Sequence, residues 1–224
     1  MNAIAPSLLR SNQYALAIHT ASPDLGLAIS NFAGDDRQQV NAELGRDIST
    51  QLQLRLAEFL APQTWADLAF LAVAKGPGGF TGTRLGVVTA RTIAQQLEIP
   101  LFAISTLAAV AWMEGSAQFA GVLNQNIAVQ MPAHRGELYT AIYTISVSDK
   151  NLPRLLTRLS DTVMSPELWQ QTLDQWHDAY RLVQVEGGLG NTTQSLLELA
   201  YLDWQQGIRS HWSEALPFYG QSPV

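Results

Sequence analysis

The feature that most constrains this chain is a glycine-rich turn between a strand-length apolar run and a long helical segment. Residues 68–74 are all apolar, and residues 76–82 read Gly-Pro-Gly-Gly-Phe-Thr-Gly before a helical pattern that continues to about Leu97. A continuous apolar run of this length is typical of a central strand covered on both faces. The sequence therefore predicts a strand, a tight turn and a helix in direct succession, as in α/β folds.

A glycine-rich turn of this kind can bind phosphate through its N–H groups and the helix N-terminus. The P-loop pattern needs a lysine after its last glycine, but Lys75 precedes this turn. The dinucleotide-binding pattern needs a third glycine where this chain has Thr81. We therefore favour a structural role, a tight reversal, over ligand contact, although the residues leave both open. The residues concerned are Gly76, Gly78, Gly79, Thr81 and Gly82.

The helix after the turn carries a stripe of very small residues. Its members fall four positions apart, at Gly82, Gly86, Ala90 and Ala94. Each glycine inside a helix costs about 1 kcal/mol relative to alanine, so the stripe indicates a packing requirement. Small residues let another backbone approach closely. That backbone belongs either to the same chain, in the sheet or a neighbouring helix, or to a helix of another chain, and the spacing does not decide between them.

The segment before the turn predicts three strands and a helix. A turn at residues 22–24 separates two strand-like stretches, and strands are expected at residues 14–19, 25–32 and 37–44. Apolar residues then recur at helical spacing, at Ile48, Leu52, Leu56, Phe59 and Leu60. Asp47 or Ser49 is expected to cap this helix and Pro62 to end it. With a strand at residues 101–104, these elements predict an α/β half with a mixed sheet.

The second half shows a similar alternation without detectable sequence self-similarity. Helices are expected at residues 106–113, 166–176 and 192–205, and strands at residues 127–131, 136–146, 155–163 and 182–185. No Pro/Ser-rich linker separates the halves, so we expect two tightly packed lobes. The expected divisions are an N-terminal extension at 1–13, a first lobe at 14–108 and a second lobe at 109–224, whose end is free to pack back on the first lobe.

Composition and charge exclude several classes of protein. The net charge is −6 and the 13 Lys and Arg residues are scattered, which disfavours autonomous RNA binding, since phosphate neutralisation dominates that affinity. Cysteine is absent, which excludes disulfides and thiol catalysis. No apolar run approaches the ~20 residues needed to cross a bilayer, and no secretory signal is evident. We expect a cytoplasmic protein without membrane contact.

The sequence offers no catalytic or metal-binding constellation. None of the histidines, His19, His134, His177 and His211, lies four residues from another, so no helix can present a His-x-x-x-His metal pair. The Gly-x-Ser-x-Gly nucleophile motif is also absent. We therefore predict no catalytic residue and no metal ligand.

Residues 71–91 resemble the signature of the TsaB family. That pattern is Gly-Pro-Gly-Ser-Phe-Thr-Gly-x-Arg-x-Gly, and this chain departs from it only at Gly79, where the family has serine. Further family-like segments follow in the right order, at residues 16–22, 99–107, 135–139 and 216–219. The resemblance extends from Tyr14 to Tyr219 and is thin between residues 145 and 215.

The resemblance implies a two-lobed α/β fold of the actin/Hsp70/sugar-kinase kind, ribonuclease H-like, with mixed sheets flanked by helices. It also implies a non-catalytic subunit that binds a TsaD-like transferase, with a TsaE-like ATPase in the assembly. In that assembly a threonylcarbamoyl group is placed on adenosine 37 of tRNA, which this chain reaches only through its partner. The resemblance implies no cofactor of its own, and it leaves open ATP or ADP at the joint interface.

The family's dimer contact is built from the two first-lobe helices. Here these are residues 48–60 and 82–97, and the resemblance favours an intermolecular contact for the small stripe. The candidate partner-binding residues are Leu52, Leu56, Phe59, Gly82, Leu85, Gly86, Ala90, Ile93 and Ala94. The same helices could form a homodimer when the protein is alone, and the sequence does not separate the two.

Several positions depart from the family pattern. His19 replaces the usual Asp after the first strand, Ile48 stands where the family often has His, and residues 132–134 replace Asp-Ala-Arg. An ATP–metal site of this fold needs carboxylates near the phosphates. Their loss argues against the first alternative, an active small-molecule kinase or ATPase of the same fold. A zinc-type peptidase, the second alternative, is disfavoured by the missing histidine pair.

Overall fold

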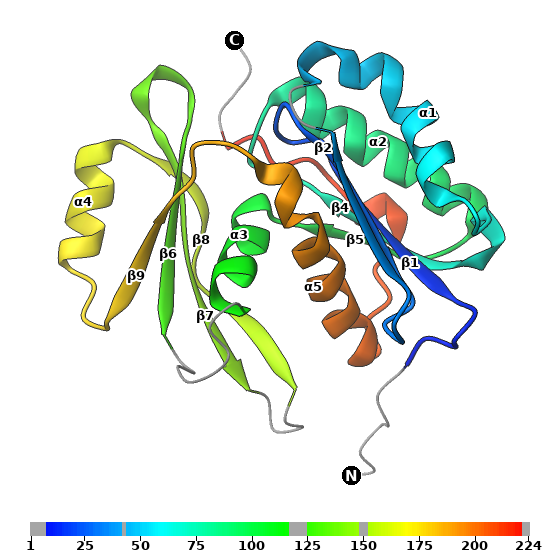
Figure 1. Cartoon of the computed structure of the whole chain (residues 1–224). Coiled ribbons are helices and arrows are strands. Elements are labelled where there is room, and N and C mark those ends of the chain that lie inside the picture. The colour runs from blue at the N-terminus through cyan, green and yellow to red at the C-terminus, as the bar shows by residue number, and fades with distance from the viewer. Residues whose placement is uncertain (1–7, 42–43, 117–124, 148–151, 221–224) are drawn as a thin grey trace.

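The computed structural model describes residues 8–41, 44–116, 125–147 and 152–220. It contains two mixed β-sheets, with helices between them and on their outer faces (Figure 1). The first sheet has the strand order β3-β2-β1-β4-β5. Its strands are β1 (Tyr14–His19), β2 (Leu25–Ser30), β3 (Asp36–Asn41), β4 (Leu68–Ala74) and β5 (Leu101–Ile104).

Strands β1 to β3 form an antiparallel meander, and β4 and β5 extend it in parallel with β1. This is the strand order of a ribonuclease H-like fold and confirms the predicted fold class. Strand β4 is buried along its whole length, as its continuous apolar run predicts. Helices α1 (Ile48–Leu60) and α2 (Phe80–Leu97) cover one face of this sheet, and α5 (Thr193–Gln205) covers the other (Figure 1).

The second sheet repeats the order of the first four strands. Its order is β8-β7-β6-β9, with β6 to β8 antiparallel and β9 parallel to β6. These strands are β6 (Asn126–Pro132), β7 (Leu138–Val147), β8 (Pro153–Met164) and β9 (Tyr180–Gln184). Helix α4 (Pro166–Asp174) packs on one face and α3 (Thr106–Ser116) on the other. The two lobes therefore share a topology that sequence comparison of the halves did not reveal.

Two helices lie between the sheets and connect the lobes. Helix α3, which follows the first sheet in sequence, packs on the second, whereas α5, near the chain end, packs on the first. The indole Nε1 of Trp112 on α3 donates a hydrogen bond of 2.6 Å to Glu198 on α5. The predicted division between residues 108 and 109 falls inside α3. The lobes are thus interleaved, each sheet being covered by a helix from the other half of the sequence.

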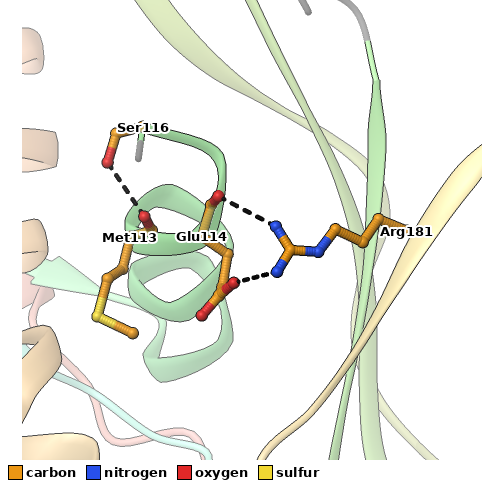
Figure 2. A network of polar contacts seen from close by, with 4 residues as sticks. All are labelled: Met113, Glu114, Ser116 and Arg181. Carbon is orange, nitrogen blue, oxygen red and sulfur yellow. Dashed lines mark hydrogen bonds and ion pairs between the residues drawn. The ribbon is translucent and has the colours of Figure 1, made fainter. Parts of the chain in front are cut away.

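The end of α3 is attached to the edge strand of the second sheet. Arg181 on β9 forms a 2.7 Å salt bridge with the carboxylate of Glu114 and also contacts the Glu114 carbonyl at 3.5 Å (Figure 2). The Ser116 hydroxyl donates to the carbonyl of Met113 at 3.3 Å in the last turn (Figure 2). Both charged side chains are partly exposed, so this pair contributes at most about 1 kcal/mol.

The predicted caps of α1 are wrong. The 3-10 turn Gly45–Asp47 runs directly into α1, and Asp47 has helical backbone angles (φ −72°, ψ −12°) without a capping hydrogen bond. The Ser49 hydroxyl donates backwards to the carbonyl of Arg46 at 3.0 Å. A continuous helical backbone leaves neither side chain in the extended geometry that an N-cap requires.

Most other predicted elements are confirmed, with small shifts of their ends. The third strand ends at Asn41 rather than Leu44, and residues 42–43 lie outside the described part of the chain, as do residues 1–7 of the expected extension. The remaining 3-10 turns are Trp65–Asp67, His134–Gly136, Leu189–Thr192 and Trp212–Glu214. None of the described helices combines the length and the hydropathy needed to span a bilayer.

Candidate functional site

The glycine-rich turn packs directly on the turn that follows β1. A Cβ on Gly78 would lie 2.2 Å from the carbonyl oxygen of Ala21, and one on Gly82 would lie 2.1 Å from that of Thr20. The Gly79 N–H donates to the Ala21 carbonyl at 2.7 Å, and the Thr20 hydroxyl donates to the Gly82 carbonyl at 2.7 Å. These contacts support the structural role, because the glycines admit a neighbouring backbone and the Gly79 N–H is already engaged.

The chain end holds the turn from the other side. Gly76 has a φ of +98°, and a Cβ there would lie 2.3 Å from the carbonyl oxygen of Phe218. The Phe218 N–H donates to the Lys75 carbonyl at 2.7 Å, and the Phe80 and Tyr219 rings lie 4.5 Å apart. The returning chain end thus fixes the first residue of the turn.

Gly79 differs from its neighbours because it has free space around it. The nearest atom to a Cβ at this position is the Ala21 carbonyl oxygen, 3.7 Å away. Gly79 is also the N-cap of α2, with the extended backbone (φ −60°, ψ 123°) in which serine caps helices. The one departure from the family signature is therefore sterically neutral. Thr81, in the first turn of α2, is exposed.

The small stripe on α2 faces the protein's own sheet. A Cβ on Gly86 would meet the Thr20 hydroxyl oxygen at 2.2 Å, and Ala90 and Ala94 are fully buried in the first-lobe core. The stripe therefore serves an intramolecular contact, which was one of the two interpretations that its spacing allowed.

The predicted partner-binding residues need correction for the same reason. Leu52, Leu56 and Phe59 of α1 lie in that core, together with Gly86, Ala90 and Ala94 of α2, and none of these is on the surface. The apolar face of each helix is the face that the sheet covers, because burial there stabilises the fold. Gly82, Leu85 and Ile93 are partly buried at the margin of this face.

The outward faces of the same helices carry exposed aliphatic side chains. Leu54 on α1 is 57% exposed and Val88 on α2 is 51% exposed. The two helices lie next to each other on the outer face of the first sheet (Figure 1). The sequence-based prediction did not include either residue, because both fall outside the regular spacing that marks the buried face of each helix. The sign that the sequence does offer is that an apolar residue stands outside that spacing. We call Leu54 and Val88 the outer-face pair.

His19 is buried at the end of β1 and is uncharged at neutral pH. Neither ring nitrogen has a hydrogen-bond partner within the described residues. Burial lowers the pKa of His19 to about 4, and the nearby carboxylate of Asp24 opposes this shift only in part. A neutral imidazole therefore occupies the position where the family pattern has a carboxylate.

A cavity of about 270 Å³ opens in front of the glycine-rich turn, between the lobes. Gly78, Gly79, His134 and Glu186 line it, and Glu186 is the single carboxylate among the described residues of its lining. Across the described ranges, no group of three or more His, Cys, Asp or Glu side chains is arranged to hold a metal ion. The part of the lining that the structure describes thus lacks the carboxylate pair expected of an ATP–metal site.

Together, the strand order, the interleaved helices and the closed glycine turn define a two-lobed α/β protein of the actin/Hsp70/sugar-kinase type. A solved structure, YeaZ from Pseudomonas aeruginosa, shares this fold with a TM-score of 0.71. It is 20% identical, over 92% of this chain and 99% of that one.

In sequence, the chain is similar to TsaB proteins, which confirms the resemblance found in the glycine-rich segment. The tRNA threonylcarbamoyladenosine biosynthesis protein TsaB of Bacillus subtilis is 42% identical over 84 residues, 38% of this chain and 33% of that protein. The Escherichia coli protein of that name is 30% identical over 134 residues, 57% and 54% of the two chains. These matches thus span between a third and about half of the curated relatives. The family model of TsaD, tRNA N6-adenosine threonylcarbamoyltransferase, matches residues 49–152.

Proposed function

We propose that this chain is a non-catalytic subunit in the biosynthesis of tRNA N6-threonylcarbamoyladenosine and that it binds a TsaD-like transferase through the outward faces of α1 and α2. The names of its TsaB relatives support the process. The observation that carries the binding mode is the outer-face pair, Leu54 and Val88, exposed on adjacent helices. Complete burial of one such side chain contributes about 1.5–3 kcal/mol, so this pair can anchor a helix-to-helix contact.

The partner would gain a rigid surface rather than a chemical group. Both helices are fixed on the sheet by fully or nearly fully buried residues such as Leu52 and Ala90, so binding requires little ordering of this chain. A subunit that contacts one conformation of the transferase more favourably than another shifts its population toward that conformation. In this proposal, the chain acts by stabilising the competent form of the transferase.

The residues in and near the 270 Å³ cavity in front of the glycine-rich turn support the proposal that this chain is not catalytic by itself. His19 is neutral and buried, and only one carboxylate, that of Glu186, is found among the lining residues that the structure describes. The assembly that we propose includes a TsaE-like ATPase, acts in the cytoplasm, and takes any ATP or ADP at the joint interface. The net charge of −6 fits a chain that reaches tRNA through its partner.

The test is size exclusion with light scattering on this chain alone and mixed with the TsaD-like protein of the same cell. We expect a 1:1 complex with the wild type. Leu54→Glu and Val88→Glu should each weaken it about 100-fold or more, because a charge would be buried in an apolar contact. Leu168→Glu on α4 is the matched control, since Leu168 is 49% exposed on the other lobe and should bind as the wild type does.

Three outcomes would count against this proposal. Unchanged binding of the Leu54 and Val88 variants would remove the proposed surface. A dimer of the chain alone that these variants disrupt, without any complex with the transferase, would favour a homodimeric protein that has no enzyme partner. Magnesium-dependent ATP hydrolysis by the isolated chain would favour an active kinase or ATPase of this fold.

A further inference from the structure

A second cavity lies behind the glycine-rich turn, on the side where the chain end returns. Its volume is about 540 Å³, within the range of about 300–1,000 Å³ that is typical of small-molecule sites. Segments from both lobes contribute to it, including Lys75 directly after β4, the end of β5, the start of α3, β8 and α5. It is thus a space between the lobes, and none of the partner-binding helices borders it.

Charged side chains of both signs line this cavity. Lys75 and Arg154 supply positive charge, and Asp161 and Asp203 supply negative charge. Within the described part of the chain, none of these four groups forms a salt bridge with another. Asp161 accepts a hydrogen bond from Tyr143, and Arg154 donates one to Ser146. No side-chain hydrogen bond joins Lys75 or Asp203 to a described residue.

Both carboxylates are partly removed from water. Burial raises the pKa of Asp161, although hydrogen bonds from Ser105 and Tyr143 and the charge of Lys75 oppose the shift. Burial alone raises the pKa of Asp203. A carboxylate that burial has partly removed from water is stabilised by a ligand cation, and the Lys75 ammonium can pair with a ligand anion.

Hydrogen-bonding groups stand between these charges. The Tyr143 hydroxyl donates to Asp161 at 2.5 Å and lies 3.3 Å from the Ser105 hydroxyl, whose oxygen accepts from the Ala108 N–H in the first turn of α3. Apolar residues such as Ala103, Leu199 and Phe218 complete the lining. The cavity therefore combines opposite charges, hydroxyl groups and apolar surface in a space of small-molecule size.

From this arrangement we propose that the cavity binds a small zwitterion, a compound with one ammonium and one carboxylate group, as in a free amino acid. Lys75 neutralises the carboxylate of the ligand and Asp203 neutralises its ammonium. Because the ligand has no net charge, it can place an opposite charge beside each of these two groups without changing the net charge of the cavity. The proposal does not depend on the transferase partner, since the cavity is formed by this chain alone.

Isothermal titration of the purified chain with free L-amino acids, one at a time, tests the proposal. We expect at least one of them to bind. Its decarboxylated amine and its 2-hydroxy acid, which each lack one charge, should bind about tenfold more weakly or worse. Lys75→Met and Asp203→Asn should weaken binding by a similar factor, whereas Asp178→Asn, at an exposed site on the second lobe, should not.

Circular dichroism should show that each variant is folded, so that a loss of binding can be attributed to the replaced side chain. The absence of binding by any free amino acid would overturn the proposal. So would equal affinity for an amino acid and its singly charged analogues, or wild-type affinity in both the Lys75 and Asp203 variants.

Discussion

Replacing Gly78 with serine is expected to lower the free energy of unfolding by about 3 kcal/mol. The new Cβ would lie 2.2 Å from the carbonyl oxygen of Ala21, which is closer than real Cβ atoms come. The obstacle is backbone, and the same carbonyl accepts the Gly79 N–H, so the turn cannot move away without losing that hydrogen bond. Urea unfolding of the variant, compared with the wild type, measures the loss.

The adjacent residue provides the matched control. Gly79→Ser introduces the same side chain one position later, where a Cβ has 3.7 Å of space, and serine is favoured over glycine at an N-cap by only a few tenths of a kcal/mol. We expect this variant to be as stable as the wild type or slightly more stable. Equal stability of the two serine variants would contradict the close packing of this turn against Ala21. It would then favour a ligand-binding role for residues 76–82.

Acid is expected to destabilise the protein through His19. Its pKa is about 4 in the folded chain and about 6.5 when unfolded, so the unfolded state binds the proton more tightly. The contribution of His19 to the free energy of unfolding is therefore fully present above about pH 6.5. It is lost as the pH drops toward 4, by about 3 kcal/mol in all. The physical cause is the cost of placing a charged imidazole where neither nitrogen has a partner among the described residues.

The free energy of unfolding should be measured in urea between pH 7 and pH 4 for the wild type and for His19→Leu. The leucine variant should lose this part of the pH dependence, while His177→Gln, which alters an exposed histidine, should keep it. Asp161 and Asp203 have pKa values raised by burial, and they act in the opposite direction in all three proteins. An identical pH dependence in wild type and His19→Leu would show that His19 is accessible or charged in the folded protein.

The first half of the fold could be predicted from sequence because its signals are strong and local. The bounds predicted for β1, α1, β4 and β5 agree with the structure. A continuous apolar run specifies β4, Pro62 ends α1, and Pro100 separates α2 from β5. What the sequence could not show is which sheet α5 covers, since an amphipathic helix does not identify the surface it packs on.

The candidate site was predictable only in part. A structural role for Gly78 and Gly82 was favoured because the sequence matches neither of the two phosphate-binding patterns. Their close contacts with the backbone of Ala21 and Thr20 support that role. Most of the predicted partner-binding residues of both helices are buried against the sheet, because the regular apolar spacing from which they were chosen marks the core-facing side of a helix. Lys75 and Asp203 are far apart in the sequence, and no local pattern predicts that they line one cavity.

The most direct test of the proposed function is a reconstituted tRNA modification reaction. It contains the TsaD-like transferase, the TsaE-like ATPase, ATP, an activated threonylcarbamoyl donor and unmodified tRNA of the same cell, with or without this chain. The threonylcarbamoyladenosine that is formed is measured. We predict that the wild-type chain and Leu168→Glu stimulate the reaction equally, that Val88→Glu stimulates it about tenfold less or worse, and that the chain without transferase forms no product. Full activity without this chain, full stimulation by Val88→Glu, or product formed without the transferase would contradict a non-catalytic, partner-binding subunit.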